Sequence, residues 1–175
     1  MIEYFEKGTR RFECEWYPAP FVPPRELTIQ SSGICFADNG KITLVNDGRG
    51  WALPGGYPEN DETLEQALIR EVDEEACALV LDFEYIGSLK NIELSPVPEG
   101  RSPLFYQARY WTRVKNLDFE PQFEMTERIE IEPDLFVPLI RWKTKVIAQL
   151  ILDAAISVEL QKSAVKGDQC KPTEG

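Results

Sequence analysis

The chain has 175 residues, a formal net charge of −11 and a hydrophobic fraction of 43%. That length and composition fit one domain with a real core. The negative charge argues against nucleic-acid binding and against adhesion to anionic membranes, because clustered Lys and Arg hold phosphates. An anionic small substrate remains open if a metal ion or a local basic pocket offsets the repulsion.

The residue types present also limit the chemistry and the compartment. Histidine is absent, so acid–base work falls to carboxylates, Lys, Tyr or Cys. Cys14, Cys35, Cys77 and Cys170 lack the paired spacing of zinc sites, which predicts free thiols. We find no apolar run of signal-peptide or membrane-span length, and therefore expect a cytoplasmic protein without a membrane partner.

The first part of the chain predicts an extended segment followed by strands. Residues 1–26 end in a proline-rich stretch and are expected to form an extended lead-in outside the core. Residues 27–37 and 41–46 read as two strands joined by the turn sequence Asp-Asn-Gly at 38–40.

A helix is predicted to begin at Thr63. Thr63 and Gln66 have the spacing of a capping box, and Leu64, Leu68 and Val72 recur every four residues. The remaining chain is expected to contain one or two strands at 79–94, a strand at 104–114, an irregular acidic segment at 115–134, a short strand at 135–140 and a helix at 142–161. The tail over 163–175 is expected to be disordered.

Three glutamates crowd one side of the predicted helix. Glu71, Glu74 and Glu75 stand at positions i, i+3 and i+4, so their carboxylates converge. Like charges at this spacing repel, but a hard divalent cation such as Mg²⁺ or Mn²⁺ would reverse the sign, because it prefers oxygen ligands. An acidic turn by itself is more often a solvated face, so the surrounding residues decide between the two interpretations.

The spacing around this cluster is specific. Gly56, Glu62, Arg70 and the three glutamates match six specified positions of the signature of the Nudix hydrolases, which the chain resembles over residues 51–78. At average residue frequencies, a chance match is on the order of 10⁻⁷ per starting position. The resemblance implies an α/β fold of the Nudix type, an α/β/α sandwich with a mixed sheet between helices, in a single domain over 27–162.

The resemblance also implies a site. Glu71, Glu74, Glu75 and the Gly56 carbonyl would bind Mg²⁺ or Mn²⁺, while Arg70 and Glu62 would orient those carboxylates through an ion pair. The reaction would be hydrolysis of a nucleoside diphosphate linked to another group, such as ADP-ribose, a dinucleotide or a modified nucleoside triphosphate. The alternative is a Nudix-fold module that binds or senses a nucleotide without hydrolysing it.

Two positions depart from the signature at the end of the helix. Cys77 stands where the family has Gly, and Ala78 where it has a larger apolar residue. Because that Gly is expected to need a positive φ, we predict that the helix runs one residue further or ends through a different turn.

Other parts of the site are less defined by the sequence. Glu127 and Glu130 are candidates for a further acid, with a solvated acidic loop as the alternative for each. Aromatic side chains that could stack on a base are Trp51, Tyr57, Phe105, Tyr106 and Trp111, and none is preferred. Residues 1–26 and the helix at 142–161 are candidate contacts of a homodimer.

Overall fold

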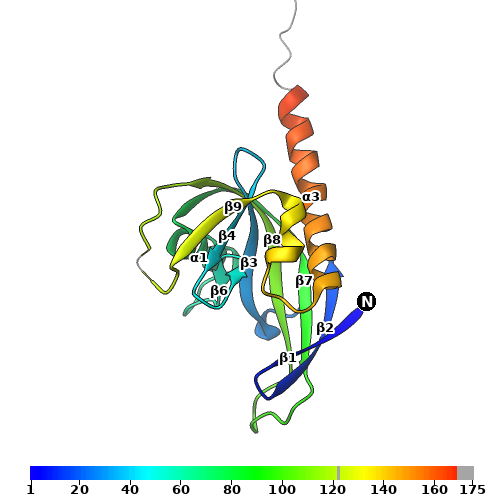
Figure 1. Ribbon diagram of the computed structural model, residues 1–175. Coiled ribbons are helices and arrows are strands. Elements are labelled where there is room, and N and C mark those ends of the chain that lie inside the picture. The colour runs from blue at the N-terminus through cyan, green and yellow to red at the C-terminus, as the bar shows by residue number, and fades with distance from the viewer. Residues whose placement is uncertain (122, 169–175) are drawn as a thin grey trace, which may run out of the picture.

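The structure, a computed structural model, describes residues 1–121 and 123–168 (Figure 1). The strands are β1 (Ile2–Lys7), β2 (Arg10–Pro18), β3 (Thr28–Phe36), β4 (Ile42–Asn46), β5 (Trp51–Ala52), β6 (Gly55–Gly56), β7 (Ala78–Glu93), β8 (Leu104–Asn116) and β9 (Glu127–Ile131). The helices are α1 (Leu64–Ala76), α2 (Phe136–Leu139) and α3 (Lys145–Asp168), with short 3₁₀ helices η1 (Arg25–Leu27) and η2 (Pro133–Leu135). Within the described residues, no helix is long and apolar enough to cross a membrane.

All the strands join one mixed sheet. Its order is β1-β2-β7-β8-β3-β4-β5, with β6 paired to β3 and β9 paired to β4. The central pair β3 and β8 is parallel, and the other pairs are antiparallel. Since β6 and α1 follow one another in the chain, the pairing of β6 with β3 fixes the start of the acidic segment against the centre of the sheet.

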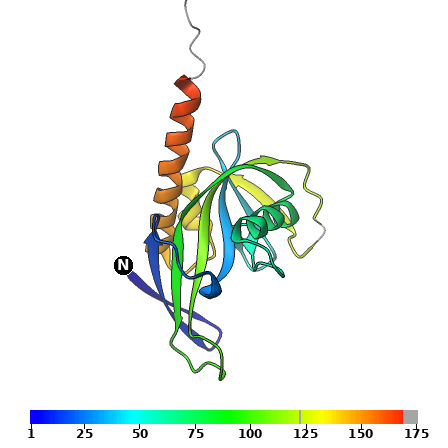
Figure 2. The same cartoon turned by 180° about the vertical axis from the view of Figure 1, so that it is seen from behind.

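Helices cover the two faces of the sheet, as Figures 1 and 2 show. On one face, Leu68 and Val72 of α1 pack in a cluster with Tyr110. On the other, Ile147 and Ile151 of α3 belong to a separate core cluster that contains residues of β3 and β8. Neighbouring residues of one strand therefore serve different cores, as alternation along a strand requires. The predicted α/β/α sandwich is confirmed.

The acidic helix begins where the sequence predicts. The Thr63 hydroxyl accepts a hydrogen bond from the Gln66 amide, and the Gln66 side chain accepts one from the Thr63 amide, which completes the capping box. Leu68 and Val72 are fully buried below this cap. Capping and the apolar stripe together fix the rotation of α1, and so decide where its glutamates point.

The predicted lead-in over residues 1–26 is wrong for most of its length. Residues 2–18 form the β1–β2 hairpin, and β2 pairs with β7 from Phe12 opposite Glu93 to Pro18 opposite Gly87. Phe12, Cys14 and Trp16 alternate inward and are buried, whereas their charged neighbours face outward. The charged residues and the prolines that follow conceal this alternation of period two in the sequence.

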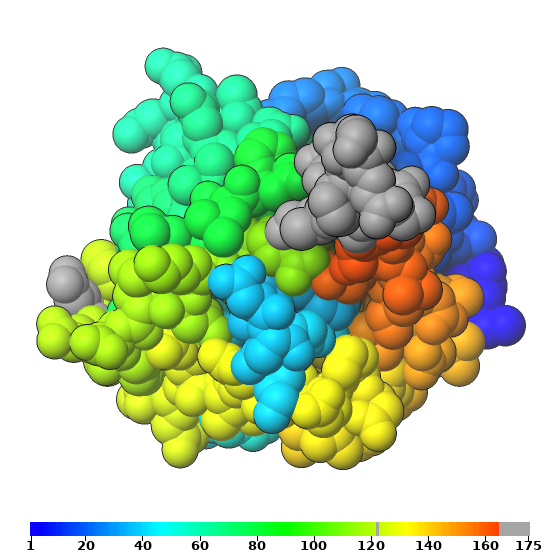
Figure 3. Space-filling view, turned by 90° about the horizontal axis from the view of Figure 1, so that it is seen from above, coloured from blue at the N-terminus to red at the C-terminus, as the bar shows by residue number. Residues whose placement is uncertain are grey.

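Two predictions near the C-terminus also fail. Residues 135–140, expected as a strand, form η2 and α2, whereas the strand of this region is β9 in the segment expected to be irregular. Helix α3 continues through the residues 163–168 that were expected to be disordered, and residues 169–175 lie outside the described part of the chain. Figure 3 looks down on the end of this helix and on the neighbouring β3–β4 turn.

Helix α1 ends at Ala76, and Cys77 itself adopts the left-handed conformation, with φ 48° and ψ 53°. Both predicted alternatives, a longer helix or a different turn, are therefore wrong. The Arg128 guanidinium donates to the carbonyls of Ala76 and Cys77, and the Leu117 amide donates to the same Cys77 carbonyl. These bonds hold Cys77 in a conformation that a residue with a Cβ disfavours.

Replacing Cys77 with Gly is expected to stabilise the protein by about 1 kcal/mol, because glycine adopts this backbone conformation without strain. The measurement is the free energy of unfolding in urea. Cys77→Ala is the control, since it removes the thiol and keeps the strain, and no comparable gain is expected for it. Equal gains in both variants would show that the thiol, and not the backbone, carries the cost.

Candidate active site

The two glycines of β6 bring backbone close to the acidic helix. Gly55 and Gly56 pair with Ser32 and Ser31 of β3. A Cβ on Gly56 would overlap Oε1 of Glu71, so only glycine lets this carboxylate lie against the strand. The glycine of the signature is thus required by a close approach of side chain to backbone.

Glu75 lies in the same corner and is the most desolvated acid of the cluster. Its Oε2 accepts a hydrogen bond of 2.8 Å from the Gly55 amide. Burial, with a smaller contribution from the negative charges of Glu71 and Glu124, raises the pKa of Glu75 to about 7, and the hydrogen bond from the Gly55 amide opposes this rise. Burial also raises the pKa of Glu71. Both carboxyls therefore lie where a nearby positive charge would favour ionisation.

Arg70 is the centre of a hydrogen-bond network that joins the acids. Its guanidinium donates to both Glu62 oxygens at 2.9 and 3.0 Å, to Oε1 of Glu71 at 3.0 Å and to Oε2 of Glu74 at 3.0 Å. It also donates to the Tyr57 carbonyl at 3.1 Å. The predicted pair of Arg70 with Glu62 is present, and it connects the loop before α1 to the carboxylates.

The residues suit a hard divalent cation, although they are not gathered as a formed site. In the part of the chain that the structure describes, no three acidic side chains surround one point in ligand geometry. Arg70 bonds to both Glu71 and Glu74, so its positive charge lies where their oxygens converge. The groups that could bind a cation here offer oxygen atoms, and the Glu71 carboxylate lies directly against the backbone of Gly56. Oxygen ligands are what Mg²⁺ and Mn²⁺ prefer.

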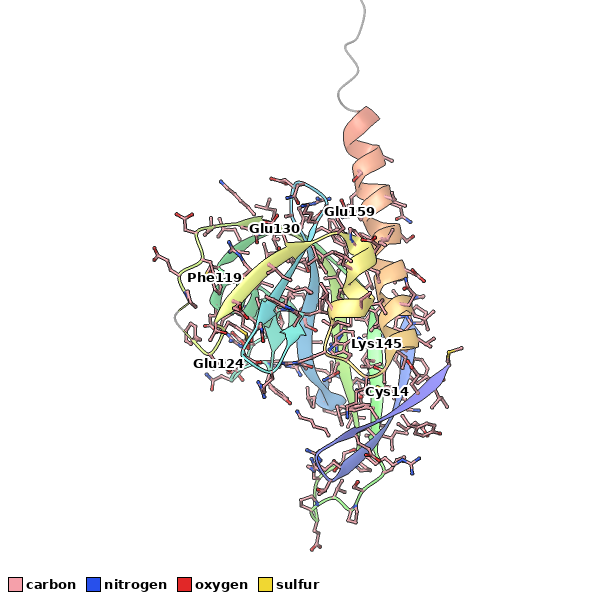
Figure 4. All side chains as sticks on the ribbon, in the orientation of Figure 1. Cys14, Phe119, Glu124, Glu130, Lys145 and Glu159 are labelled. Atoms are coloured by element: carbon pink, nitrogen blue, oxygen red, sulfur yellow. The ribbon has the colours of Figure 1, made fainter. Side chains whose placement is uncertain are left out.

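The two further acids named from the sequence lie on β9 and have other partners. Glu127 accepts a hydrogen bond from Asn46, and Glu130 accepts from Asn39 and Asn116. These two amides lower the pKa of Glu130, which is ionised without help from a metal. Figure 4 shows Glu130 at one end of β9 and Glu124 near the other.

Glu124, in the segment between β8 and β9, acts electrostatically on the acidic cluster, because its charge contributes to the raised pKa of Glu75. Sequence reasoning did not single it out. The segment between β8 and β9 has no periodic pattern, so nothing in it distinguishes one acid from another. The one feature that could have identified Glu124 is its position just before β9, the strand that pairs with β4. Because β9 was not predicted from the sequence, this feature could not be used.

A cavity of about 840 Å³ opens beside the acidic corner. Gly55 and Glu75 line it, and so does Trp142 from the segment between α2 and α3. Seven of the chain's 19 basic residues line the same cavity: Lys7, Arg10, Arg49, Arg101, Arg109, Arg141 and Lys143. The acidic chain therefore does contain a local basic pocket. Of the aromatic candidates, Tyr57 and Phe105 line the cavity.

Two of these arginines are held close to the acids. Asp47 accepts hydrogen bonds from the side chains of Arg49 and Arg141, and its own side chain is only 3% exposed. The bonds from Arg49 chiefly, with those from Arg141, hold the pKa of Asp47 well below its usual range. Two guanidinium groups on one carboxylate leave a net positive charge, and Arg141 acts electrostatically on Glu75.

The fold is thus a mixed sheet between helices, and the site is an acidic helix that lies against the glycines of β6 beside a basic cavity. The comparison with known families agrees with this fold. A profile of the NUDIX domain matches residues 28–142, so the chain belongs to the Nudix family. The family and the fold predicted from the sequence are confirmed.

Individual relatives are similar at low identity. The chain is 26% identical over 136 residues to YtkD, a candidate 8-oxo-dGTP diphosphatase of Bacillus subtilis, and the match covers 77% of this chain and 79% of the relative. A point mutant of the Bacillus subtilis pyrophosphohydrolase BsRppH matches in structure with a TM-score of 0.58, 21% identity, and coverage of 94% of this chain and 98% of that one.

A third structure is the NUDIX domain of Shewanella oneidensis NrtR in complex with ADP ribose. It matches with a TM-score of 0.56, 17% identity, and coverage of 79% of this chain and 94% of that one. At these identities the two structural matches support the fold alone.

Proposed function

We propose that the chain is a divalent-metal-dependent pyrophosphohydrolase acting on a nucleoside diphosphate linked to another group. The observation that carries this proposal is the position of Glu75. It is a desolvated carboxyl in the acidic cluster, and it lines the wall of a large cavity rich in basic side chains. An acid cluster able to hold cations beside cationic side chains suits a substrate with several phosphate charges.

Each part of the site has a role in this proposal. Glu71, Glu74, Glu75 and the Gly56 carbonyl would hold Mg²⁺ or Mn²⁺, which, when bound, neutralises phosphate oxygens and acidifies a water molecule. Arg70 and Glu62 orient the carboxylates. Arg49 and Arg141, fixed by Asp47, are placed to receive phosphate oxygens that project into the cavity.

The name of the curated relative YtkD supports a nucleotide substrate, and the names of the two structural matches are compatible with it without selecting one. YtkD is named for 8-oxo-dGTP, BsRppH for pyrophosphohydrolysis, and the NrtR domain was crystallised with ADP ribose. The candidate substrates therefore remain of three classes, which are ADP-ribose, dinucleotides and modified nucleoside triphosphates.

The test is a hydrolysis assay on the purified protein with Mg²⁺ or Mn²⁺ and members of the three classes, with detection of phosphomonoesters and pyrophosphate. Turnover of at least one class is expected, with a loss of at least about 10²-fold when EDTA removes the metal. Nucleotide binding in calorimetry without any turnover would contradict the proposal and support a nucleotide-binding or sensing module. A homodimer and a cytoplasmic location stay predictions.

A further inference from the structure

Arg109 of β8 lies in the floor of the cavity and is only 3% exposed. In the sheet it is opposite Ser32 of β3, and Ser32 is opposite Gly55 of β6. Arg109 is therefore two strands away from the glycine that binds Glu75, a separation of about 10 Å at the usual strand spacing. Because Gly55, Glu75 and Arg109 all line the cavity, one ligand can contact both the acidic corner and Arg109.

The Arg109 guanidinium has fewer partners than its burial requires. One terminal nitrogen donates to the Ala108 carbonyl at 3.1 Å and the other to Oε1 of Gln107 at 2.9 Å. Its Nε has no hydrogen-bond partner. No acidic side chain among the described residues forms an ion pair with it, and burial lowers its pKa to about 10. A buried cation left in this state is costly unless a ligand supplies the missing acceptors.

Arg113, a second buried arginine of β8, has a structural role and serves as a comparison for Arg109. It lies four residues further along β8, on the same face, and its guanidinium is 5.5 Å from the Trp111 ring. It donates to Glu159 of α3 and to the Ala37 carbonyl, and it does not line the cavity. Arg113 has an acidic partner, whereas Arg109 lines the cavity and forms no ion pair among the described residues. Arg109 is therefore the arginine that is available to a ligand in the cavity.

The residues around Arg109 fix the orientation of its guanidinium, so that it can select a ligand by the positions of hydrogen-bond acceptors as well as by charge. Its guanidinium is 5.3 Å from the centre of the Trp142 ring, which restricts its plane. The Gln107 amide that accepts from Arg109 donates in turn to Gln30, so a relay of fixed polar groups crosses the floor. Arg141 acts electrostatically on Glu75, and the proposed function assigns Arg49 and Arg141 to the phosphates.

We propose that Arg109 reads the base of the nucleotide, donating paired hydrogen bonds to the O6 and N7 acceptors of a guanine ring and so selecting guanine over adenine. Adenine presents a donor where guanine presents O6, and a guanidinium can only donate. This inference rests on the proposed function, because it needs the diphosphate to lie at the acidic corner. It narrows the substrate to guanine nucleotides among the classes carried forward.

The test compares guanine and adenine nucleotides in four proteins: the wild type, Arg109→Met, Arg109→Lys and Arg113→Met. We measure kcat/KM for GTP and ATP, and binding of GMP and AMP by calorimetry in the absence of metal. For the wild type, a preference for guanine of about 10- to 100-fold is expected in both measurements, as one bidentate arginine contact gives.

The preference is expected to fall below about threefold in Arg109→Met, mainly through the KM for GTP, and to an intermediate value in Arg109→Lys, which keeps the charge and loses the paired donors. Arg113→Met is the matched control and should keep the wild-type preference. Thermal melting checks the fold. Arg109→Met is expected to melt no lower than the wild type, because it removes an unpaired buried charge.

Three results would overturn the inference. The first is a wild type without base preference. The second is an Arg109→Met variant that keeps the preference, and the third is an equal loss for guanine and adenine, which would mean that Arg109 binds phosphate or sugar. If GTP and ATP are not hydrolysed at all, the proposed function fails for these substrates, while the binding of GMP and AMP still decides the role of Arg109.

Discussion

Replacing Glu75 with Gln is expected to lower kcat by about 10²- to 10⁴-fold, the range that a positioned acid–base or metal-binding carboxylate contributes. The amide keeps the shape of the side chain and can still accept the bond from the Gly55 amide. What it removes is the negative charge at the wall of the cavity. The loss should therefore appear in turnover and in the affinity for Mn²⁺, with little change in the fold.

The same variant is expected to be at least as stable as the wild type in the absence of metal. Burial raises the pKa of Glu75 from 4.5 to about 7. An acid whose folded-state pKa is raised favours the folded state below its unfolded pKa, and that advantage disappears as the pH rises through the folded pKa. The wild type should thus lose on the order of 2 kcal/mol of stability between pH 4.5 and pH 7, and the variant should lose less.

Glu65→Gln is the matched control for both measurements. Glu65 lies on the same helix, but its carboxylate accepts a hydrogen bond of 2.9 Å from the Tyr110 hydroxyl instead of joining the acidic corner. The kcat of the Glu65→Gln variant is expected to stay within about twofold of the wild-type value, because the change is a polar substitution outside the site. A Glu75→Gln protein with full activity would remove Glu75 from the proposed site.

The start and the buried face of the acidic helix were predictable because they depend on residues that are close together in the sequence. The capping box at Thr63, the apolar stripe through Leu68 and Val72, and the turn before β4 each depend on spacings of a few positions. The Gly56 requirement was predictable as a motif. Its physical cause, the approach of Glu71 to within contact of the strand, needed the structure.

The cavity was not predictable, because it comes from pairing between distant segments. Arg109 and Gly55 come to lie two strands apart only because β8 pairs with β3 and β3 pairs with β6. The N-terminal hairpin contributes Arg10 to the same wall through the pairing of β2 with β7. Hydrophobic periodicity records which face of a strand is buried, but it does not record which strand is the neighbour. Basic side chains scattered through the sequence therefore give no sign that they share one pocket.

Arg70→Met is expected to destabilise the metal-free protein by about 2–4 kcal/mol, because it leaves three partly buried carboxylates without their shared cation. The Arg70 side chain is 20% exposed, and its partners Glu62, Glu71 and Glu74 are 15% to 31% exposed. The same positive charge could be supplied by a bound divalent ion. We therefore expect saturating Mg²⁺ to raise the melting temperature more in Arg70→Met than in the wild type.

This difference separates the two roles that Arg70 has in the proposed site. If it only neutralises the acids, Mg²⁺ should restore both stability and activity to the variant. If it also orients them, stability should recover while kcat stays low, because a spherical ion does not replace the fork of hydrogen bonds to Glu62. Arg70→Lys, which keeps the charge without the fork, should then resemble the Mg²⁺-bound Met variant. A Met variant that gains nothing from Mg²⁺ would mean that these glutamates do not bind the ion.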